Sequence, residues 1–226
     1  MAAETDSKYT IYIASWGNPL AWRKVKYICN GETKGGFTSA VCAKADHYLI
    51  YVQDSAATAT SSITLEEAVE CAQKAGLQVT KDMTTRIKPS DWTNLRPTVE
   101  NYVKCVAEKA GIDAHPIVVG AAGKYADYEY KATPDQIAAE LLAKLWQAID
   151  DKLGGAPEGA NIRLHLDLTH GVNYMPVLLL QTAQHLANIL LAAGASAVTI
   201  DAYNATPEDW HYVKVYHQHT THIYFP

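Results

Sequence analysis

The pattern of hydrophobic and polar positions changes its period within residues 162–194. Residues 162–168 alternate between apolar and polar side chains, which predicts a strand with two different faces. Residues 177–191 repeat their apolar side chains at helical spacing, and Gly194 supplies the stop. The junction between them, residues 169–174, is mostly polar or small. In open α/β sheets ligands bind at such junctions, and the start of the helix suits phosphate or another anion.

Apolar runs elsewhere in the chain predict further strands, because β-branched and aromatic residues are typical of strands covered on both faces. These runs lie at residues 9–15, 47–53, 116–120 and 197–203, with a short strand at 77–80 and a strand at 210–216 that is expected to pair antiparallel at the edge. Helices are expected at residues 38–45, 64–76, 97–111 and 134–153. The alternation predicts an α/β fold, a doubly wound and mostly parallel Rossmann-like sheet, in one domain over residues 1–226.

Local signals refine this outline. Thr64 and Glu67 have the spacing of a capping box, in which the Thr64 hydroxyl bonds the Glu67 N–H while Glu67 reaches back. Residues 31–36 and 84–95 carry turn-forming and polar residues without a clear period, and we expect loops there.

Composition limits the class of protein. The chain has 226 residues and 48% hydrophobic residues, enough to bury a sizeable core. Its net charge of −5 argues against duplex nucleic acid as the main partner. Residues 1–8 are polar and acidic, unlike a signal peptide. The apolar residues 177–193 include Gln181, Gln184 and His185, which predicts a core helix and not a membrane span. A cytoplasmic location is expected.

The four cysteines, Cys29, Cys42, Cys71 and Cys105, are scattered along the chain. None forms a CxxC motif. We therefore expect ordinary buried thiols in a reduced, intracellular protein.

Polar loops follow several of the predicted parallel strands, whose carboxyl ends meet at one edge of the sheet. Many α/β proteins have polar loops at this edge, but here they combine glycine, hydroxyl, amide and cationic groups. They lie at residues 15–18, 53–55, 120–124 and 169–174. A basic run, Arg23 to Lys26, follows the first strand. It is either a solvated edge or a surface that faces a phosphate.

Several familiar chemistries lack their motifs. The sequence has no GxSxG elbow, no GxGxxG after the first strand and no GxxxxGK[ST] loop. Asp167 is expected to bond the backbone or Thr169 at the strand end, in preference to acting as a base. His217, His219 and His222 have a spacing that invites a metal site, but no cysteine or paired carboxylate lies nearby in sequence, and an exposed terminal stretch is favoured. We expect no metal and no cofactor.

Asp167-Leu168-Thr169-His170-Gly171 spells D-x-T-H-G and resembles the DxTHG family of CRISPR-associated proteins, whose sensor is a CARF (CRISPR-associated Rossmann fold) domain. The loop Ser15-Trp16-Gly17-Asn18-Pro19 resembles the loop after the first strand in that family. The ending Gln53-Asp54-Ser55 and the extension Asn173-Tyr174-Met175-Pro176 are also similar to it. The resemblance covers most of the chain.

This resemblance implies a homodimer in which two carboxyl-end surfaces form one pocket for a cyclic oligoadenylate, most often the tetramer. A two-fold symmetric ring on a two-fold axis lets one set of loops be used twice. The ligand-binding residues implied are Trp16, Gly17, Asn18, Gln53, Asp54, Ser55, Gly120, Gly123, Asp167, Thr169, Gly171 and Asn173. No duplex nucleic acid and no membrane is expected as a partner.

The resemblance also implies metal-independent cleavage of the ring to a cyclic 2′,3′-phosphate as one of two roles, binding alone being the other. Ser15 and a cation such as Lys124 are candidates for orienting and neutralising the phosphate. His170 has three open roles: bonding the ligand, acting as general acid or fixing the turn. Larger relatives carry a HEPN ribonuclease domain with an R-x4-6-H active-site motif. Arg163 and His170 match this spacing only by accident, because they overlap the DxTHG motif itself, so we expect the ribonuclease domain to be missing. The chain is then either a stand-alone CARF protein or a sensor domain without its effector. The alternatives are an α/β enzyme for a small nucleotide-like substrate, and a transcriptional regulator, for which no helix-turn-helix is found.

Overall fold

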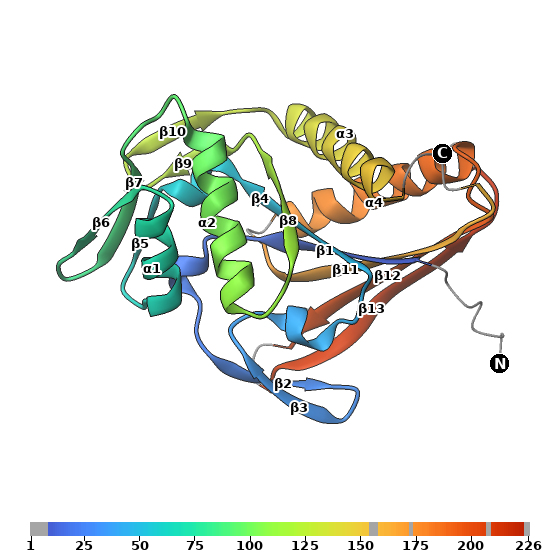
Figure 1. Cartoon of the computed structure of the whole chain (residues 1–226), viewed down its shortest axis with the longest axis horizontal. Coiled ribbons are helices and arrows are strands. Elements are labelled where there is room, and N and C mark those ends of the chain that lie inside the picture. Colours follow the sequence, from blue (N-terminus) through green and yellow to red (C-terminus); the bar gives the residue numbers. More distant parts are fainter. Residues whose placement is uncertain (1–8, 154–157, 172–173, 207–208, 224–226) are drawn as a thin grey trace.

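The computed structural model describes residues 9–153, 158–171, 174–206 and 209–223. Within them, an eight-stranded sheet runs in the order β3-β2-β13-β12-β11-β1-β4-β8 (Figure 1). Its strands are β1 (Tyr9–Trp16), β2 (Val25–Cys29), β3 (Glu32–Gly36), β4 (His47–Gln53), β8 (Ala114–Val119), β11 (Asn161–His170), β12 (Ala197–Ala205) and β13 (His211–Thr220). The predicted α/β class with a mainly parallel sheet is confirmed.

The centre of the sheet is parallel. β11 lies between β1 and β12, and β4 joins β1 to β8, all in parallel pairing. The carboxyl ends of β1, β4, β8 and β11 therefore meet at one edge, as the sequence predicted.

The far side of the sheet differs from the prediction. β13 pairs antiparallel with β12, but it is not the last strand, because β2 pairs with β13 and β3 pairs with β2. Residues 31–36, predicted as a loop, mostly form β3. This strand is polar and rich in glycine, so it carries no hydrophobic signal and is held by backbone pairing to β2.

Two pairs of helices cover the two faces of the sheet (Figure 1). On one face lie α1 (Glu66–Lys74) and α2 (Leu95–Lys109), and on the other α3 (Pro134–Leu153) and α4 (Met175–Ala192). β1 alternates between the two cores: Ile11 and Ile13 pack with α3 and α4, whereas Tyr12 and Trp16 pack with α1 and α2. This alternation determines which face of the sheet each side chain at the end of β1 points to.

α4 is the one helix among the described residues that is long and apolar enough to cross a membrane, with a mean hydropathy of 1.3. Leu179, Ala183 and Leu186 are nevertheless fully buried against the sheet. Their burial is the behaviour of the core helix that the sequence predicted.

Two smaller β units stand beside the carboxyl edge. A three-stranded sheet has the order β5-β7-β6, from β5 (Ala59–Ser61), β6 (Leu77–Lys81) and β7 (Thr85–Pro89). A hairpin is formed by β9 (Ala122–Tyr125) and β10 (Tyr128–Lys131). The prediction of a loop at residues 84–95 was wrong for β7, whose short alternating pattern is interrupted by Pro89.

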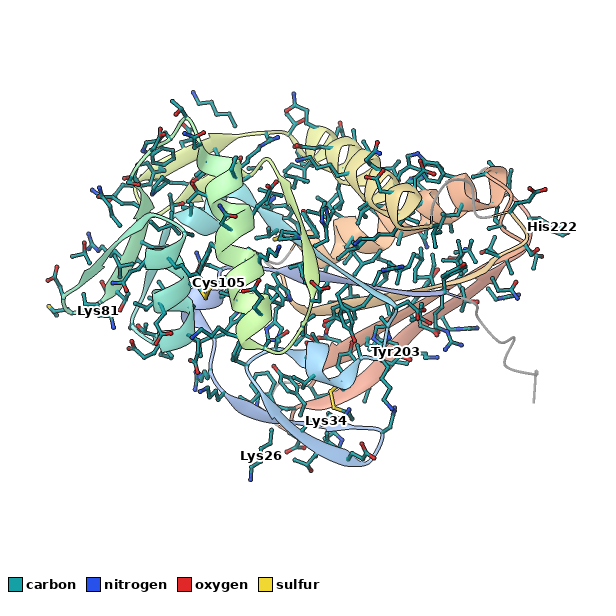
Figure 2. The ribbon with its side chains drawn as sticks, in the orientation of Figure 1. Lys26, Lys34, Lys81, Cys105, Tyr203 and His222 are labelled. Carbon is teal, nitrogen blue, oxygen red and sulfur yellow. A yellow bond between two sulfur atoms is a disulfide. The ribbon has the colours of Figure 1, made fainter. Side chains whose placement is uncertain are left out.

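The expectation of free thiols is contradicted. Cys29 is bonded to Cys42 and Cys71 to Cys105 (Figure 2). The first disulfide joins β2 to a short 3-10 helix, η2 (Ser39–Cys42), which replaces the α-helix predicted at residues 38–45. The second joins α1 to α2. Each cysteine pair is distant in sequence, so only the tertiary fold brings its two sulfur atoms together.

The predicted capping box is also wrong. α1 begins after Leu65, which makes no side-chain capping bond. The Thr64 hydroxyl bonds Thr85 at 2.9 Å, and Glu67 pairs with Lys24. Thr64 and Glu67 therefore bond residues distant in sequence, in place of the local capping bonds that their spacing predicted.

Candidate functional site

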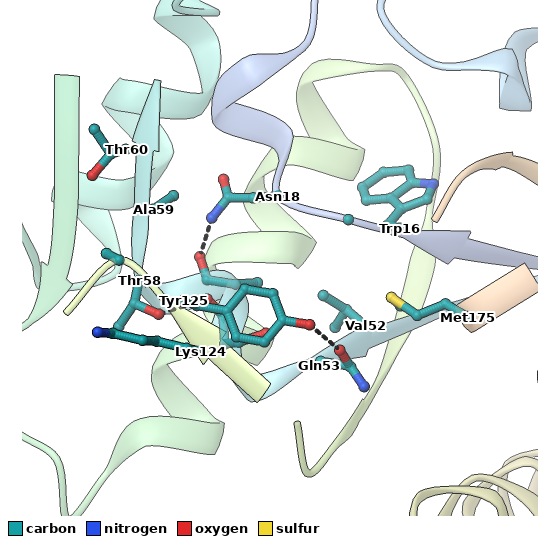
Figure 3. A pocket seen from close by; sticks show the side chains of 14 residues that line it. Trp16, Asn18, Val52, Gln53, Thr58, Ala59, Thr60, Lys124, Tyr125 and Met175 are labelled. Carbon is teal, nitrogen blue, oxygen red and sulfur yellow. Dashed lines mark hydrogen bonds between the residues drawn. The ribbon is translucent and has the colours of Figure 1, made fainter. Parts of the chain in front are cut away.

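A cavity of about 330 Å³ opens at the carboxyl ends of β1 and β4 (Figure 3). The hairpin β9–β10 and strand β5 form its other walls. Six of the residues predicted for the site line it: Trp16, Gly17, Asn18, Gln53, Ser55 and Lys124. Three separate segments of the sequence therefore converge on one space.

Asn18 fixes the shape of the loop after β1. Its Nδ2 donates to the carbonyl of Ala56 at 2.6 Å, and its Oδ1 accepts from the N–H of Leu20 at 2.9 Å. Leu20 belongs to a short 3-10 helix, η1 (Pro19–Ala21), that Asn18 caps. Both ends of the amide are used, so Asn18 holds the cavity wall together.

Gln53 joins three elements at the end of β4. Its Oε1 accepts from the hydroxyl of Tyr174 at 2.8 Å and from that of Tyr125 at 3.4 Å. Its Nε2 lies 3.5 Å from the carbonyl of Gly120. Burial raises the pKa of Tyr125, and its bond to Tyr174 raises it further, so the Tyr125 phenol stays a neutral donor. Tyr174 lies within the Asn173–Pro176 extension named above, and Tyr125 directly follows the loop at residues 120–124, but neither was among the predicted ligand-binding residues.

Lys124 is the cation of the cavity. It is exposed on β9, and no ion pair among the described residues involves it. Gly123 beside it has a φ of +104°, a conformation that favours glycine, at the position opposite Tyr130 in the hairpin. Lys124 can therefore give its charge to a bound anion.

Asp54 and Gly120 lie behind the lining. Burial raises the pKa of Asp54, and this is opposed by Arg96, whose Nε is 3.8 Å from Oδ2. The N–H of Gly120 donates to Glu140 at 3.0 Å, and a Cβ on Gly120 would come within 3.2 Å of Ala132. Both residues therefore help to hold the backbone next to the lining residues Gln53 and Ser55 in place.

Asp167 is fully engaged inside the molecule. Its Oδ1 accepts from the N–H of Thr169 at 3.0 Å, and its Oδ2 accepts from the hydroxyls of Tyr12 at 2.6 Å and Ser39 at 2.7 Å. Thr169 in turn accepts from the N–H of Ala205 at 3.1 Å. The prediction that Asp167 bonds the backbone near Thr169 is confirmed, and neither residue lines the cavity.

His170 also lies outside the cavity lining. Its Nε2 is 3.4 Å from the N–H of Ser39 and 3.1 Å from the hydroxyl of Tyr27, and its ring centre is 4.5 Å from that of Trp22. An N–H can only donate, so Nε2 is the acceptor and the ring is neutral, and burial lowers the pKa of His170. Of the three roles left open, the geometry favours fixing the turn.

Ser15 is completely buried, and its Oγ has no hydrogen-bond partner among the described residues. A Cβ on Gly171 would lie 2.6 Å from this oxygen and 2.8 Å from Cδ of Pro176, so only glycine fits without a shift. Ser15 therefore stands directly behind the start of α4. Asn173, the remaining predicted residue, lies outside the described residues.

Residues 11–207 match the family model described as CRISPR system endoribonuclease Csx1, CARF domain. The chain belongs to this family. A curated relative, the CRISPR system endoribonuclease Csx1 of Methanocaldococcus jannaschii, is 27% identical over 203 residues, which cover 87% of this chain and 37% of the relative. The chain thus spans a little over a third of the relative's length. The resemblance read from the DxTHG and SWGNP motifs is confirmed at the level of the family.

The basic run and the C-terminal histidines considered in the sequence lie outside this cavity. Lys24 and Lys26 of the basic run line a second hollow with Gly35 and Phe37. In the described part of the chain, no group of three or more His, Cys, Asp and Glu side chains is placed to hold a metal ion. His217 bonds Asp201 at 2.7 Å and His219 lies 2.9 Å from Thr199, because residues 211–220 form β13 and are not a trailing end.

Proposed function

We propose that this CARF domain senses cyclic oligoadenylate, cyclic tetra-adenylate in the first instance, in type III CRISPR signalling in the cytoplasm. The observation that carries the proposal is the cavity at the carboxyl edge, where the SWGNP loop, the end of β4 and Lys124 meet inside the segment that matches the family. Lys124 supplies charge for a phosphate, and the half-buried ring of Tyr125 supplies a surface on which a base stacks.

The amides of Asn18 and Gln53 are already bonded within the chain, so they shape the site and do not read the adenine edges. The N–H of Gly17 is likewise bonded to the carbonyl of His170 at 2.7 Å. Contacts to the ligand then fall to Lys124 and to Tyr125. Such contacts favour phosphate and stacked bases.

The size of the cavity supports a ligand shared by two chains. About 330 Å³ is near the lower limit of small-molecule pockets, which span roughly 300–1,000 Å³. A ring of four nucleotides needs more room than this. A homodimer with its two-fold axis through the ring would bring two such cavities together and supply two copies of Lys124, one from each chain.

Slow cleavage of the ring is the second part of the proposal. A ribose 2′-OH attacks its neighbouring phosphorus, a new O2′–P bond forms and the P–O5′ bond breaks, so the products end in a cyclic 2′,3′-phosphate. Water takes the proton of the 2′-OH and returns one to the leaving O5′. Lys124 stabilises the charge on the phosphate. Ser15, buried behind Gly171, acts as a positioning residue for the start of α4.

A binding panel tests the proposal. Cyclic tetra-adenylate, linear tetra-adenylate and AMP are titrated separately into the purified chain. The proposal expects the ring to bind at least tenfold more tightly than AMP. A preference for AMP would instead support a small-molecule enzyme, the alternative that the small volume of a single-chain cavity favours.

A second assay separates binding from cleavage. Labelled ring is incubated with excess protein in EDTA, and the products are resolved by chromatography. Linear products with cyclic 2′,3′-phosphate ends support the nuclease. A ring that stays intact after prolonged incubation would rule out cleavage, and the role of a sensor that only binds the ring would remain.

A further inference from the structure

The three-stranded sheet β5-β7-β6 borders the cavity. Thr58, Ala59 and Thr60 all line it, and β5 is an edge strand of the small sheet (Figure 3). A ligand in the cavity therefore contacts this sheet as well as the main one. The sequence of residues 84–95 gave no sign that they border the site.

The register of the small sheet places Arg86 next to the cavity. Thr60 on β5 is directly opposite Arg86 on β7 in the antiparallel pairing. Side chains at opposite positions share a face, with Cβ atoms about 4.5–5.5 Å apart. Burial confirms the alternation along β7: Thr85 and Ile87 are buried, whereas Arg86 and Lys88 are exposed.

The hairpin that carries Lys124 lies over this same face. Thr58 is extended and two residues before Thr60, so the two side chains point the same way. The Thr58 hydroxyl is 3.0 Å from that of Tyr130 on β10, which pairs with β9. Lys124, which lines the cavity, and Arg86, which is opposite the lining residue Thr60, therefore belong to two separate units of the fold that border the cavity.

The charge of Arg86 is not neutralised by any ion pair found among the described residues. None of the ion pairs or side-chain hydrogen bonds found among the described residues involves Arg86. Lys81 on the same small sheet is different: it is opposite Thr85, so it belongs to the other face, and its Nζ is 2.8 Å from Glu66. Lys81 is thus paired and turned away, whereas the two exposed cations of β7, Arg86 and Lys88, are in none of the ion pairs found among the described residues. Of these two, Arg86 is the one opposite Thr60, which lines the cavity.

We infer that Arg86 is a second phosphate-binding residue of the cavity. Lys124 and Arg86 then hold two different phosphates of one ligand, which makes the ligand an oligonucleotide and not a mononucleotide. Arginine suits this position because its planar donors bind phosphate in pairs. The inference rests on the proposed function and extends its site to the small sheet.

The test compares Arg86→Gln with Lys81→Gln, a matched loss of one exposed cation from the same sheet. Affinity for cyclic tetra-adenylate is measured at several salt concentrations. Arg86→Gln should weaken binding about tenfold and reduce the slope of log affinity against log salt by about 0.7, the value for one contact with single-stranded nucleic acid. Lys81→Gln should stay within about twofold of the wild type. Arg86→Lys, which keeps the charge, should recover part of the loss.

The outcomes distinguish this inference from the proposed function. If the wild-type chain binds the ring and Arg86→Gln binds it as tightly as Lys81→Gln does, Arg86 is not a phosphate ligand, although the sensor stands. If the wild-type chain does not bind the ring, both are overturned. Thermal unfolding of each variant checks that the small sheet stays folded.

Discussion

The hydroxyl of Tyr12 donates a 2.6 Å hydrogen bond to Oδ2 of Asp167, across 155 residues of sequence. Both residues are buried, on the neighbouring strands β1 and β11. Ser39 donates to the same oxygen, and its backbone N–H lies 3.4 Å from His170. The DxTHG strand is thereby tied to β1 and to the loop that carries η2, so its aspartate acts here as a structural acceptor.

Removing this acceptor should destabilise the fold. Asp167→Ala leaves the donors of Tyr12, Ser39 and Thr169 without a partner, and we expect a loss of about 3–5 kcal/mol in the free energy of unfolding. Tyr12→Phe leaves two donors on Asp167 and should cost about 1–2 kcal/mol. Urea denaturation measures both. Tyr128→Phe on the hairpin serves as a control and should stay within about 0.5 kcal/mol of the wild type. A Tyr12→Phe variant as stable as the control would contradict this account.

Gly171 should resist substitution because of Ser15. In Gly171→Ala the new Cβ would stand 2.6 Å from Ser15 Oγ and 2.8 Å from Pro176, which predicts a loss of about 1–3 kcal/mol from overpacking. Adding Ser15→Ala removes the nearer oxygen and should restore part of this loss, since the contact with Pro176 remains. A double-mutant cycle by chemical denaturation measures the coupling. Strictly additive effects of the two changes would show that Ser15 and Gly171 do not touch.

Buried histidine should make the stability depend on pH. Burial lowers the pKa of His165 from 6.5 to about 4, so the folded chain keeps this ring neutral where the unfolded chain already protonates it. The unfolded state then binds more protons between pH 6.5 and 4, and the free energy of unfolding should fall as the pH drops through that window. His170, whose pKa burial also lowers, acts in the same direction.

Variants separate this effect from general acid sensitivity. His165→Gln keeps a group that bonds Tyr212 but does not titrate, so urea midpoints between pH 7 and pH 5 should change less steeply than in the wild type. His222→Gln, an exposed control, should keep the wild-type slope. Equal slopes in all three proteins would reject buried His165 as the cause.

The disulfides should contribute to stability. They close loops with sequence separations of 13 and 34 residues, and bonds of this kind typically add about 2–4 kcal/mol. Cys71→Ala combined with Cys105→Ala should therefore lower the free energy of unfolding by about this amount. Alkylation without reductant, followed by mass spectrometry, tests the pairing itself. Four alkylated thiols in the native protein would contradict the structure.

The sequence predicted the parallel centre of the sheet because its strands carry strong apolar patterns and are followed by helices. It also predicted that the loops after β1 and β4 would meet Lys124, since the carboxyl ends of parallel strands share an edge. β3, β7 and the hairpin β9–β10 were missed. These strands are short and polar, and their stability comes from backbone pairing that a hydrophobic period does not report.

Side-chain roles were harder to predict than positions. Asn18 and Asp167 have the chemistry of ligand contacts, but their polar atoms are bonded within the chain. Sequence spacing does not show which buried donors compete for a side chain. The same limit hid both disulfides and the bonds of Tyr125 and Tyr174 to Gln53, because all of them join segments distant in sequence.

The most direct test of the central claim is isothermal titration of cyclic tetra-adenylate into the chain and into its Lys124→Gln variant. We expect saturable binding with one ring for every two chains, and an affinity at least about tenfold lower in the variant because a phosphate loses its cation. Lys131→Gln, at the other end of the same hairpin, should bind as the wild type does. Absence of binding, or equal affinity in Lys124→Gln, would contradict the assignment of this cavity as the ring site.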